Sequence, residues 1–329
     1  MRSIKFKKTI IYHHNDHDGI VAAGIVYNYI KNSPNFDIPL EDIKTVMIDY
    51  GTKLDLRDLD KRTLVWFLDY SFTNKTNIMA VTNAIMTFGH NNFIWIDHHL
   101  SSINVERTTI LGRMKGIRYV GYCGAYLSYF YTHEIFERRI VDVDYVLSQP
   151  GSILDKYYKS DNIPPFLKYV DDYDCWKKQY PDTNAFHYGF SIIDPSDITL
   201  EYLLENKKET VILNSIIERG KQVKSCLDFE NKNYHVDMYG FEVWMDGYKC
   251  FALNRKGNSL MFGDLVDKYD IVIPFYYDGY LWRYSLFTTS NNVDCEEIAK
   301  KHGGGGHAKA AGFQTRDLIF RNGKVVEPK

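Results

Sequence analysis

Residues 92–99 read Asn-Phe-Ile-Trp-Ile-Asp-His-His, an apolar run that ends in one carboxylate and two imidazoles. The apolar part, Asn92 to Ile96, has the length and composition of a buried β-strand. Asp97, His98 and His99 follow it directly, and carboxylates and imidazoles are common ligands of divalent metal ions. We therefore predict that this strand delivers a metal- and phosphate-binding group at its C-terminal end.

Two other predicted strands end in the same way. Thr9 to Tyr12 leads into His14-Asn15-Asp16-His17-Asp18-Gly19, and Leu64 to Leu68 leads into Asp69. In an open α/β sheet, ligands bind at the edge formed by the C-terminal ends of the strands. A fourth acidic cluster, Asp171-Asp172-Tyr173-Asp174, lies on a predicted helix. These segments together predict a site for two metal ions.

Strand-like runs alternate with helical patterns from Thr9 to about Asp194, which predicts an α/β fold with a mainly parallel sheet. The predicted strands are Thr9 to Tyr12, Thr45 to Ile48, Leu64 to Leu68 and Phe93 to Ile96, and the predicted helices are Ile20 to Ile30, Ile78 to Phe88, Gly124 to Phe136 and Pro165 to Trp176. Residues 1–195 are the first predicted domain.

A long amphipathic pattern follows, with apolar residues on one face and Lys and Glu on the other, and it predicts a connector helix within residues 196–233. Residues 234–329 form a second, smaller α/β domain. Its predicted strands are Phe241 to Trp244, Cys250 to Leu253, Ile271 to Tyr277 and Trp282 to Phe287, followed by a helix from Cys295 to Lys301. The run Gly303-Gly304-Gly305-Gly306-His307 comes after this helix.

Composition excludes several classes of protein. The 329 residues, 45% of them apolar, suffice for two packed domains. The net charge of −2 argues against a protein that coats long nucleic acid, so a nucleic-acid substrate should be short. No apolar stretch approaches the roughly 20 residues of a spanning helix, and we predict a cytoplasmic protein without membrane contact. The five scattered cysteines form no Cys-x-x-Cys pair and are interpreted as small buried hydrophobic residues.

The first motif has a simple structural alternative. Asp16 and Asp18 share one side of an extended segment, whereas His17 points away, and Gly19 permits a tight turn. Taken alone, this run is better interpreted as an Asp-rich helix N-cap, and Asp69 alone as a turn cap. The combination with Asp97-His98-His99 favours metal, with Asp97 orienting an imidazole through its second ring nitrogen.

Four motifs in this order, His14-x-Asp16-x-Asp18-Gly19, Asp69, Asp97-His98-His99 and Asp172, resemble those of the DHH phosphoesterase superfamily. The segment from Ile298 through His307 to Phe313 resembles the DHH-associated C-terminal domain. The resemblance spans nearly the whole chain. Within the superfamily, the chain resembles oligoribonuclease-type and RecJ-like phosphodiesterases. It implies a DHH domain joined by the connector helix to a substrate-binding domain.

The resemblance also implies two divalent metal ions, usually Mn²⁺, with Mg²⁺ or Co²⁺ as alternatives. The implied ligands are His14, Asp16, Asp18, Asp69, His98 and Asp172, with Asp69 bridging the ions; Asp69, Asp97, His98 and His99 are the implied catalytic group. His99 would face the phosphate. His13 remains an alternative to His14, and Asp171 and Asp174 to Asp172. Two such ions generate hydroxide at neutral pH, orient it in line with phosphorus and stabilise the leaving oxygen.

In the second domain, Gly304, Gly305 and Gly306 lack Cβ atoms, so their N–H groups can approach a phosphate or a base, and His307 adds a donor. A flexible loop would explain the glycines alone. Short-oligonucleotide relatives often have an Arg-Ser pair after the Ser-Leu of the last strand, where this chain has Phe287-Thr288. Arg283 is the candidate replacement as a phosphate anchor.

The resemblance implies a Mn²⁺-dependent hydrolase. We expect a phosphodiesterase or exonuclease that converts short single-stranded RNA or DNA, or linear or cyclic dinucleotides, to nucleoside 5′-monophosphates. One alternative is a phosphomonoesterase acting on a bisphosphorylated nucleotide or another small phosphate ester. A second is a non-catalytic nucleotide sensor. A homodimer is a further expectation from the resemblance.

Overall fold

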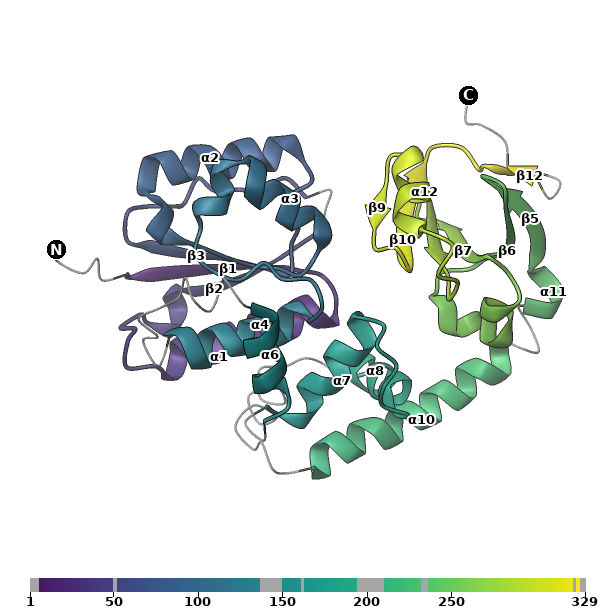
Figure 1. Ribbon diagram of the computed structural model, residues 1–329, viewed down its shortest axis with the longest axis horizontal. Coiled ribbons are helices and arrows are strands. Elements are labelled where there is room, and N and C mark those ends of the chain that lie inside the picture. The colour runs from purple at the N-terminus through teal and green to yellow at the C-terminus, as the bar shows by residue number, and fades with distance from the viewer. Residues whose placement is uncertain are drawn as a thin grey trace. The chain divides into compact units, whose positions relative to one another are not determined.

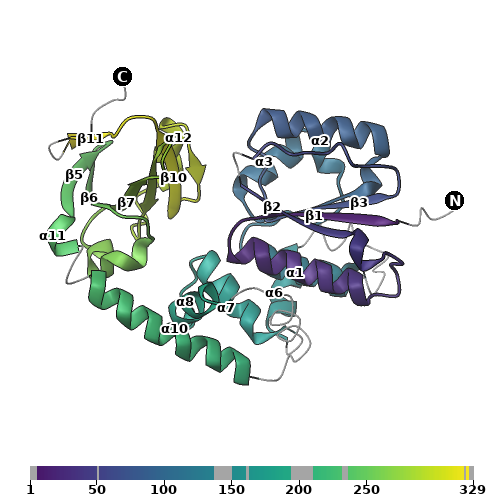
Figure 2. The same cartoon turned by 180° about the vertical axis from the view of Figure 1, so that it is seen from behind.

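The computed structural model describes residues 6–49, 52–136, 150–160, 163–193, 210–231, 236–321 and 324–325. It divides into two compact units, Met1–Lys221 and Gln222–Lys329, which Figures 1 and 2 show from opposite sides. Part of the predicted connector, residues 196–209 and 232–233, lies outside the described residues. Its described part is helix α10, Val211–Glu230, which contains the boundary between the units. The predicted domain boundaries stay predictions.

The first unit is built on a four-stranded parallel sheet. Its strands, in the spatial order β2-β1-β3-β4, are Ile43–Ile48, Lys8–His14, Thr63–Leu68 and Phe93–Ile96. Every residue of β3 and β4 is buried, which is typical of parallel strands covered on both faces. The predicted fold class, α/β with a mainly parallel sheet, is confirmed.

Helices cover both faces of this sheet. The described helices of the first unit include α1 (His17–Asn32), α2 (Lys75–Phe88), α3 (Leu100–Thr108), α4 (Gly124–Phe130), α6 (Pro150–Tyr158), α7 (Pro165–Asp174) and α8 (Thr183–Ser191), with 3₁₀ turns at Leu40–Asp42, His90–Asn92 and Ile110–Arg113. Figure 1 shows α2 and α3 on one face and α1 and α4 on the other. Alternate side chains of β3 enter the two cores, Trp66 on the α1 side and Phe67 on the α2 side.

The helix predicted at Gly124–Phe136 is an α-helix only as far as Phe130, and a π-helical turn, Tyr131–Phe136, continues it. Helices α3 and α8 were not predicted. Within α3 only Ser102 is buried, so this helix lacks the apolar periodicity on which the prediction depends.

The second unit contains a mixed eight-stranded sheet in the order β11-β12-β5-β6-β7-β8-β10-β9. The strands are β5 (Phe241–Met245), β6 (Tyr248–Asn254), β7 (Ile271–Tyr277), β8 (Trp282–Phe287), β9 (Gly305–Gly306), β10 (Ala310–Thr315), β11 (Phe320–Arg321) and β12 (Lys324–Val325); the helical segments are α11 (Asp237–Tyr239), a 3₁₀ segment (Ser259–Asp267) and α12 (Cys295–Lys301). Helix α12 packs on one face of the sheet through Ile298 and Ala299, and the 3₁₀ segment packs on the other through Met261 and Phe262.

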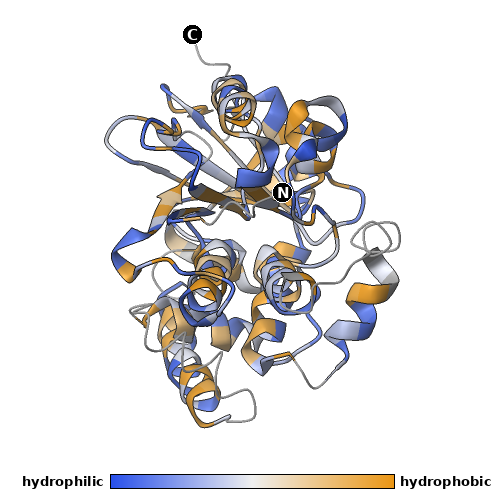
Figure 3. Cartoon of the chain, turned by 90° about the vertical axis from the view of Figure 1, so that its left-hand side faces the viewer, coloured by the Kyte–Doolittle hydropathy of each residue, from blue (hydrophilic) through white to orange (hydrophobic). Residues whose placement is uncertain are grey.

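The helices carry both apolar and hydrophilic residues, drawn orange and blue in Figure 3. Such mixed surfaces let a helix pack one face on a core and present the other to water. Across the described ranges, no helix combines the length and the hydropathy that crossing a membrane requires.

Candidate metal centre

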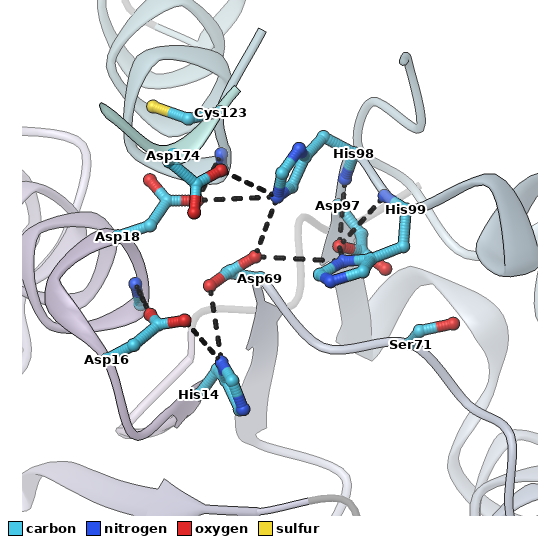
Figure 4. Close-up of polar contacts among 12 residues, drawn as sticks. His14, Asp16, Asp18, Asp69, Ser71, Asp97, His98, His99, Cys123 and Asp174 are labelled. Carbon is cyan, nitrogen blue, oxygen red and sulfur yellow. Dashed lines mark hydrogen bonds and ion pairs between the residues drawn. The ribbon is translucent and has the colours of Figure 1, made fainter. Parts of the chain in front are cut away.

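The predicted residues of the first three motifs meet at one edge of the parallel sheet. Strands β1, β3 and β4 are neighbours, and the paired residues Leu68 and Ile96 end two of them side by side. Asp69 and Asp97 therefore leave the sheet at adjacent positions. Figure 4 shows the resulting cluster: His14, Asp16, Asp18, Asp69, Asp97, His98, His99 and Asp174.

Asp69 is the central carboxylate of this cluster. Its side chain is 1% exposed, and in the described part of the chain neither of its oxygens has a hydrogen-bond partner. Oδ1 lies 3.2 Å from His98 Nε2, whereas Oδ2 lies 3.7 Å from His14 Nδ1. The backbone φ of +51° is unusual for a residue with a side chain and is a kind of strain that clusters at functional sites. The two oxygens thus face opposite sides, as in a carboxylate that bridges two cations.

His14, Asp16 and Asp69 form one group of ligand atoms, all within 4.8 Å of one another. His14 Nδ1 lies 2.7 Å from Asp16 Oδ2, and Asp16 Oδ1 accepts a hydrogen bond from the Gly19 N–H. Burial opposes the charge on His14, but the two carboxylates outweigh it and raise its pKa to about 11. His13 instead directs Nδ1 to the backbone oxygen of His14, at 2.9 Å. The structure therefore places His14, not His13, in the cluster.

His98 is the centre of a second group. Its Nε2 lies 3.2 Å from Asp69 Oδ1, 3.3 Å from Asp174 Oδ2 and 3.7 Å from Asp18 Oδ2. Burial raises the pKa of Asp18, and the charges of Asp69 and Asp174 raise it further. Burial also raises the pKa of Asp174, to about 7, although His98 opposes this shift. Three carboxylates in a buried space indicate a site that gains from a bound cation.

In the fourth motif, Asp174 lies beside His98, whereas Asp172, the ligand expected from the resemblance, faces the segment after α7. Asp172 accepts hydrogen bonds from the backbone of Gln179 (2.7 Å) and from Thr183 Oγ1 (2.5 Å). Asp171 pairs with Lys177 Nζ at 2.5 Å. Successive helical positions point about 100° apart, so these carboxylates of α7 diverge. Asp172 thus fixes the segment after α7.

Asp97 holds the second histidine of its motif in place. Its Oδ1 lies 2.8 Å from His99 Nδ1 and accepts the His98 N–H at 2.8 Å, and its Oδ2 accepts the Ser102 hydroxyl. Burial opposes the charge of Asp97, but the two imidazoles and Ser102 lower its pKa to about 2. The same contact contributes to a raised pKa of His99, against the effect of burial. Asp97 is thus placed to orient an imidazole.

The groups that hold Asp18 could not be predicted from the sequence. Its two oxygens accept the N–H groups of Gly124 (2.6 Å) and Ala125 (2.7 Å), which begin α4. The preceding N–H, of Cys123, donates to Asp171 Oδ1 at 2.9 Å. Backbone N–H groups occur in every residue except proline, so a sequence does not show which of them act as donors. The only available signal was Gly124 before an apolar helix.

We expect Gly124→Ala to damage the centre directly. A Cβ there would lie 2.9 Å from Asp69 Cβ and 3.0 Å from Asp18 Oδ2. Overpacking of this kind costs about 1–3 kcal/mol, and displaced metal-site residues should weaken Mn²⁺ binding at least about tenfold. Calorimetric titration measures the affinity and urea unfolding the stability. The control is Gly121→Ala, at φ +124° with its nearest contact 3.5 Å away; it should lose stability alone. Equal loss of Mn²⁺ affinity in both variants would contradict the prediction.

Metal affinity should fall as the pH falls. Asp174, with a pKa of about 7, and His14, with a pKa of about 11, hold protons in the metal-free protein at neutral pH and below. A cation must displace these protons, so each displaced proton should lower the affinity about tenfold per pH unit. Titration calorimetry between about pH 6 and pH 8, in buffers of different protonation enthalpy, measures the metal affinity and the number of protons released on binding. A metal affinity that does not change between about pH 6 and pH 8 would refute this expectation.

Close packing explains why two positions of the second unit are glycines. A Cβ at Gly304 would lie 2.0 Å from Gly312 O, and one at Gly306 would lie 2.6 Å from Ala311 Cα. Both glycines therefore permit the close approach of β9 to β10. Gly305 is different, because its Cβ would meet nothing within 4 Å. The N–H of His307 donates to Ala310 O at 2.7 Å.

Arg283 contacts two side chains of the second unit. Its Nε donates to Asp278 Oδ2 at 2.6 Å, and its guanidinium also contacts the Gln314 side chain. Arg283 pairs with Gln314 in the sheet, two residues along β10 from Gly312, the partner of Gly305. Arg283 thus forms an ion pair with Asp278, and its role as a phosphate anchor stays a prediction.

Comparisons with known proteins agree with this fold. No family model matches the chain. An uncharacterized protein of Acanthamoeba polyphaga mimivirus, R106, is 23% identical; the match covers 92% of this chain but only 66% of the relative's length. Among solved structures, the DHH domain of a member of the S1p family of ribosomal proteins matches with a TM-score of 0.55 and 12% identity, covering 94% of this chain and 83% of the other.

RecJ from Thermus thermophilus, in complex with Mn²⁺, has a TM-score of 0.42 and 12% identity over 93% of this chain and 49% of its own. The match to the DHH domain, at a TM-score of 0.55, is the comparison that shows the fold. The chain therefore has the fold of the DHH proteins, as its four motifs predicted.

Proposed function

We propose that this chain is a metal-dependent phosphoesterase whose centre holds two divalent ions. The observation that carries the proposal is Asp69, a buried carboxylate with no hydrogen-bond partner in the described structure and with one oxygen toward each histidine. An ionised carboxylate in such a place is costly unless a cation compensates it. One ion would use His14, Asp16 and Asp69, and the other would use Asp18, Asp69, His98 and Asp174. Carboxylate and imidazole donors suit Mn²⁺, with Mg²⁺ or Co²⁺ as alternatives.

Divalent ions at such a centre polarise a phosphate ester and lower the pKa of water. The protein's own part is to fix the groups around them. Asp97 orients His99, and its charge favours the protonated imidazole, which would donate a charge-assisted hydrogen bond to the phosphate. The amides of Gly124 and Ala125 hold Asp18 in one orientation.

The proposed substrates are short single-stranded RNA or DNA and dinucleotides, cleaved to nucleoside 5′-monophosphates. The net charge of −2 supports a short substrate, because long nucleic acid is held mainly by basic side chains. The glycine segment of the second unit, with Gly305 open to its surroundings, supports a phosphate or base contact. The alternatives are a phosphomonoesterase acting on a bisphosphorylated nucleotide and a non-catalytic nucleotide sensor.

A direct assay separates these functions. Purified protein with Mn²⁺ is incubated with a 5′-phosphorylated RNA dinucleotide, a long oligonucleotide and a bisphosphorylated nucleotide, and the products are resolved by chromatography. Fastest release of mononucleotides from the dinucleotide supports the proposal. Preference for the long strand would indicate an exonuclease on longer nucleic acid, and release of inorganic phosphate alone would indicate a monoesterase. Metal binding without turnover of any substrate would refute catalysis on these substrates.

Two neighbouring glycines test the role of the second unit. We expect Gly305→Ala to raise KM on the order of tenfold with kcat unchanged, the pattern of lost uniform binding. Gly304→Ala should instead destabilise the protein by about 1–3 kcal/mol, because its Cβ meets the backbone of Gly312. Steady-state kinetics and urea unfolding measure the two effects. An unchanged KM in Gly305→Ala would leave the glycines with a packing role only.

A further inference from the structure

Cys175 places a thiol beside the second group of ligands. It follows Asp174 at the C-terminal end of α7. Its Sγ, a carboxylate oxygen of Asp174 and a ring nitrogen of His98 all lie within 4.8 Å of one another. Among the described residues, no other cysteine belongs to such a group of ligand atoms: Cys226 is exposed, for example, and Cys250 lies in the core of the second unit.

A second observation at the same place points to a bound cation. Asp174 Oδ2 is buried without a hydrogen-bond partner among the described residues, and so are both oxygens of Asp69. Asp69 is 1% exposed. These oxygens surround His98 Nε2, at 3.3 Å for Asp174 and 3.2 Å for Asp69. A cation that satisfied them would lie within reach of a sulfur atom, an unusual neighbour for an oxygen-preferring ion.

We propose that Cys175 is a thiolate ligand for the ion on the His98–Asp174 side of the centre, and that it lets this side accept thiophilic divalent ions such as Zn²⁺ or Co²⁺. The inference deepens the proposed function and rests on its metal centre. Thiolate donors favour Zn²⁺, whereas carboxylate and carbonyl oxygens favour Mn²⁺ and Mg²⁺. The sulfur would thus give the two halves of the centre different metal preferences.

The proton balance of this step is simple. In the metal-free protein the Cys175 thiol donates a hydrogen bond to Asp171 Oδ1, 3.6 Å away, so the sulfur carries a proton there. A coordinating divalent cation displaces the proton to solvent and leaves the thiolate on the metal. Metal binding would break this hydrogen bond to Asp171, and Lys177 Nζ, 2.5 Å from the other oxygen of Asp171, would reduce the repulsion between that carboxylate and the thiolate. Oxidation is a poor alternative role, because it needs a thiolate without metal.

Cobalt spectroscopy tests the assignment without any substrate. The full chain, stripped of metal with a chelator, is titrated with Co²⁺ and followed by absorption. We expect a thiolate-to-cobalt charge-transfer band in the near ultraviolet together with weaker d–d bands in the visible. Cys175→Ser should lose the first and keep the second, whereas Cys226→Ser and Cys123→Ser should keep both. Zn²⁺ affinity should fall by about tenfold or more in Cys175→Ser, with little change for Mn²⁺.

The outcomes separate this inference from the proposed function. Visible d–d bands without a charge-transfer band in the wild-type protein would overturn the thiolate ligand and leave the metal centre standing. Absence of all cobalt bands would overturn both. If circular dichroism shows that Cys175→Ser does not fold, X-ray absorption of the zinc-loaded wild type decides. A Zn–S distance of about 2.3 Å supports the thiolate, and oxygen and nitrogen neighbours alone refute it.

Discussion

Asp69→Asn should abolish binding of the two metal ions and lower the rate of phosphoester hydrolysis by at least about a thousandfold. Asparagine keeps the shape of the side chain and tolerates the positive φ, but it has no charge and offers only one acceptor oxygen. The asparagine can neither bridge the two metal ions nor compensate their positive charge. Metal analysis of gel-filtered protein and steady-state kinetics on the best substrate measure the two losses.

Stability distinguishes this effect from simple unfolding. Asp69 has no hydrogen-bond partner in the described structure but forms ion pairs with His14 and His98, so metal-free Asp69→Asn should stay folded, with its urea midpoint lowered only by the loss of these ion pairs. Asp58→Asn, at an exposed position of the same unit, is the matched control and should leave metal content and rate unchanged. Two bound ions and nearly normal rates in Asp69→Asn would disprove the bridging role.

The second prediction with a large effect compares two acidic residues of helix α7, Asp172 and Asp174. Asp174→Asn should lower hydrolysis at least about a hundredfold and weaken binding of one ion, with little loss of stability, because Asp174 Oδ2 faces His98 without a hydrogen bond in the described structure. Asp172→Asn should cost about 2–3 kcal/mol, since a buried carboxylate that accepts hydrogen bonds from Gln179 and Thr183 is lost. Its folded fraction should keep both ions.

Metal titration and urea unfolding of the two variants together decide this assignment. The expected pattern is reciprocal: Asp174→Asn changes the metal affinity, and Asp172→Asn changes the free energy of unfolding. Loss of an ion from a stably folded Asp172→Asn protein would restore the assignment made from the sequence.

The sequence predicted those parts of the fold that depend on local pattern. Strands β1, β3 and β4 are apolar runs, and their parallel arrangement follows from the helices between them. The convergence of His14, Asp69 and Asp97 then follows, because the C-terminal ends of parallel strands share one edge. The identity of the last acid did not follow. Asp172 and Asp174 are two residues apart, and what distinguishes them is the segment from Gln179 to Thr183, which donates hydrogen bonds to Asp172.

Other parts of the site carry no signal in side-chain chemistry. Gly124 and Ala125 contribute N–H groups, which every residue but proline has. Gly304 and Gly305 are the same residue type but differ in surroundings, since a Cβ at Gly304 would meet Gly312 O whereas one at Gly305 would meet nothing within 4 Å. Such distinctions depend on tertiary contacts and appear only in the structure.

The hydrogen bonds from Gly124 and Ala125 to Asp18 join residues 106 and 107 positions apart in the chain. Contacts of such high sequence separation close late during folding, after the entropy of a long loop has been lost. During synthesis, the carboxylates of the first three motifs leave the ribosome well before α4 and α7. A nascent chain that ends before Gly124 therefore carries most of the acids without the amides that fix them. Tight metal binding should consequently mark the completion of the first unit rather than assist its early folding.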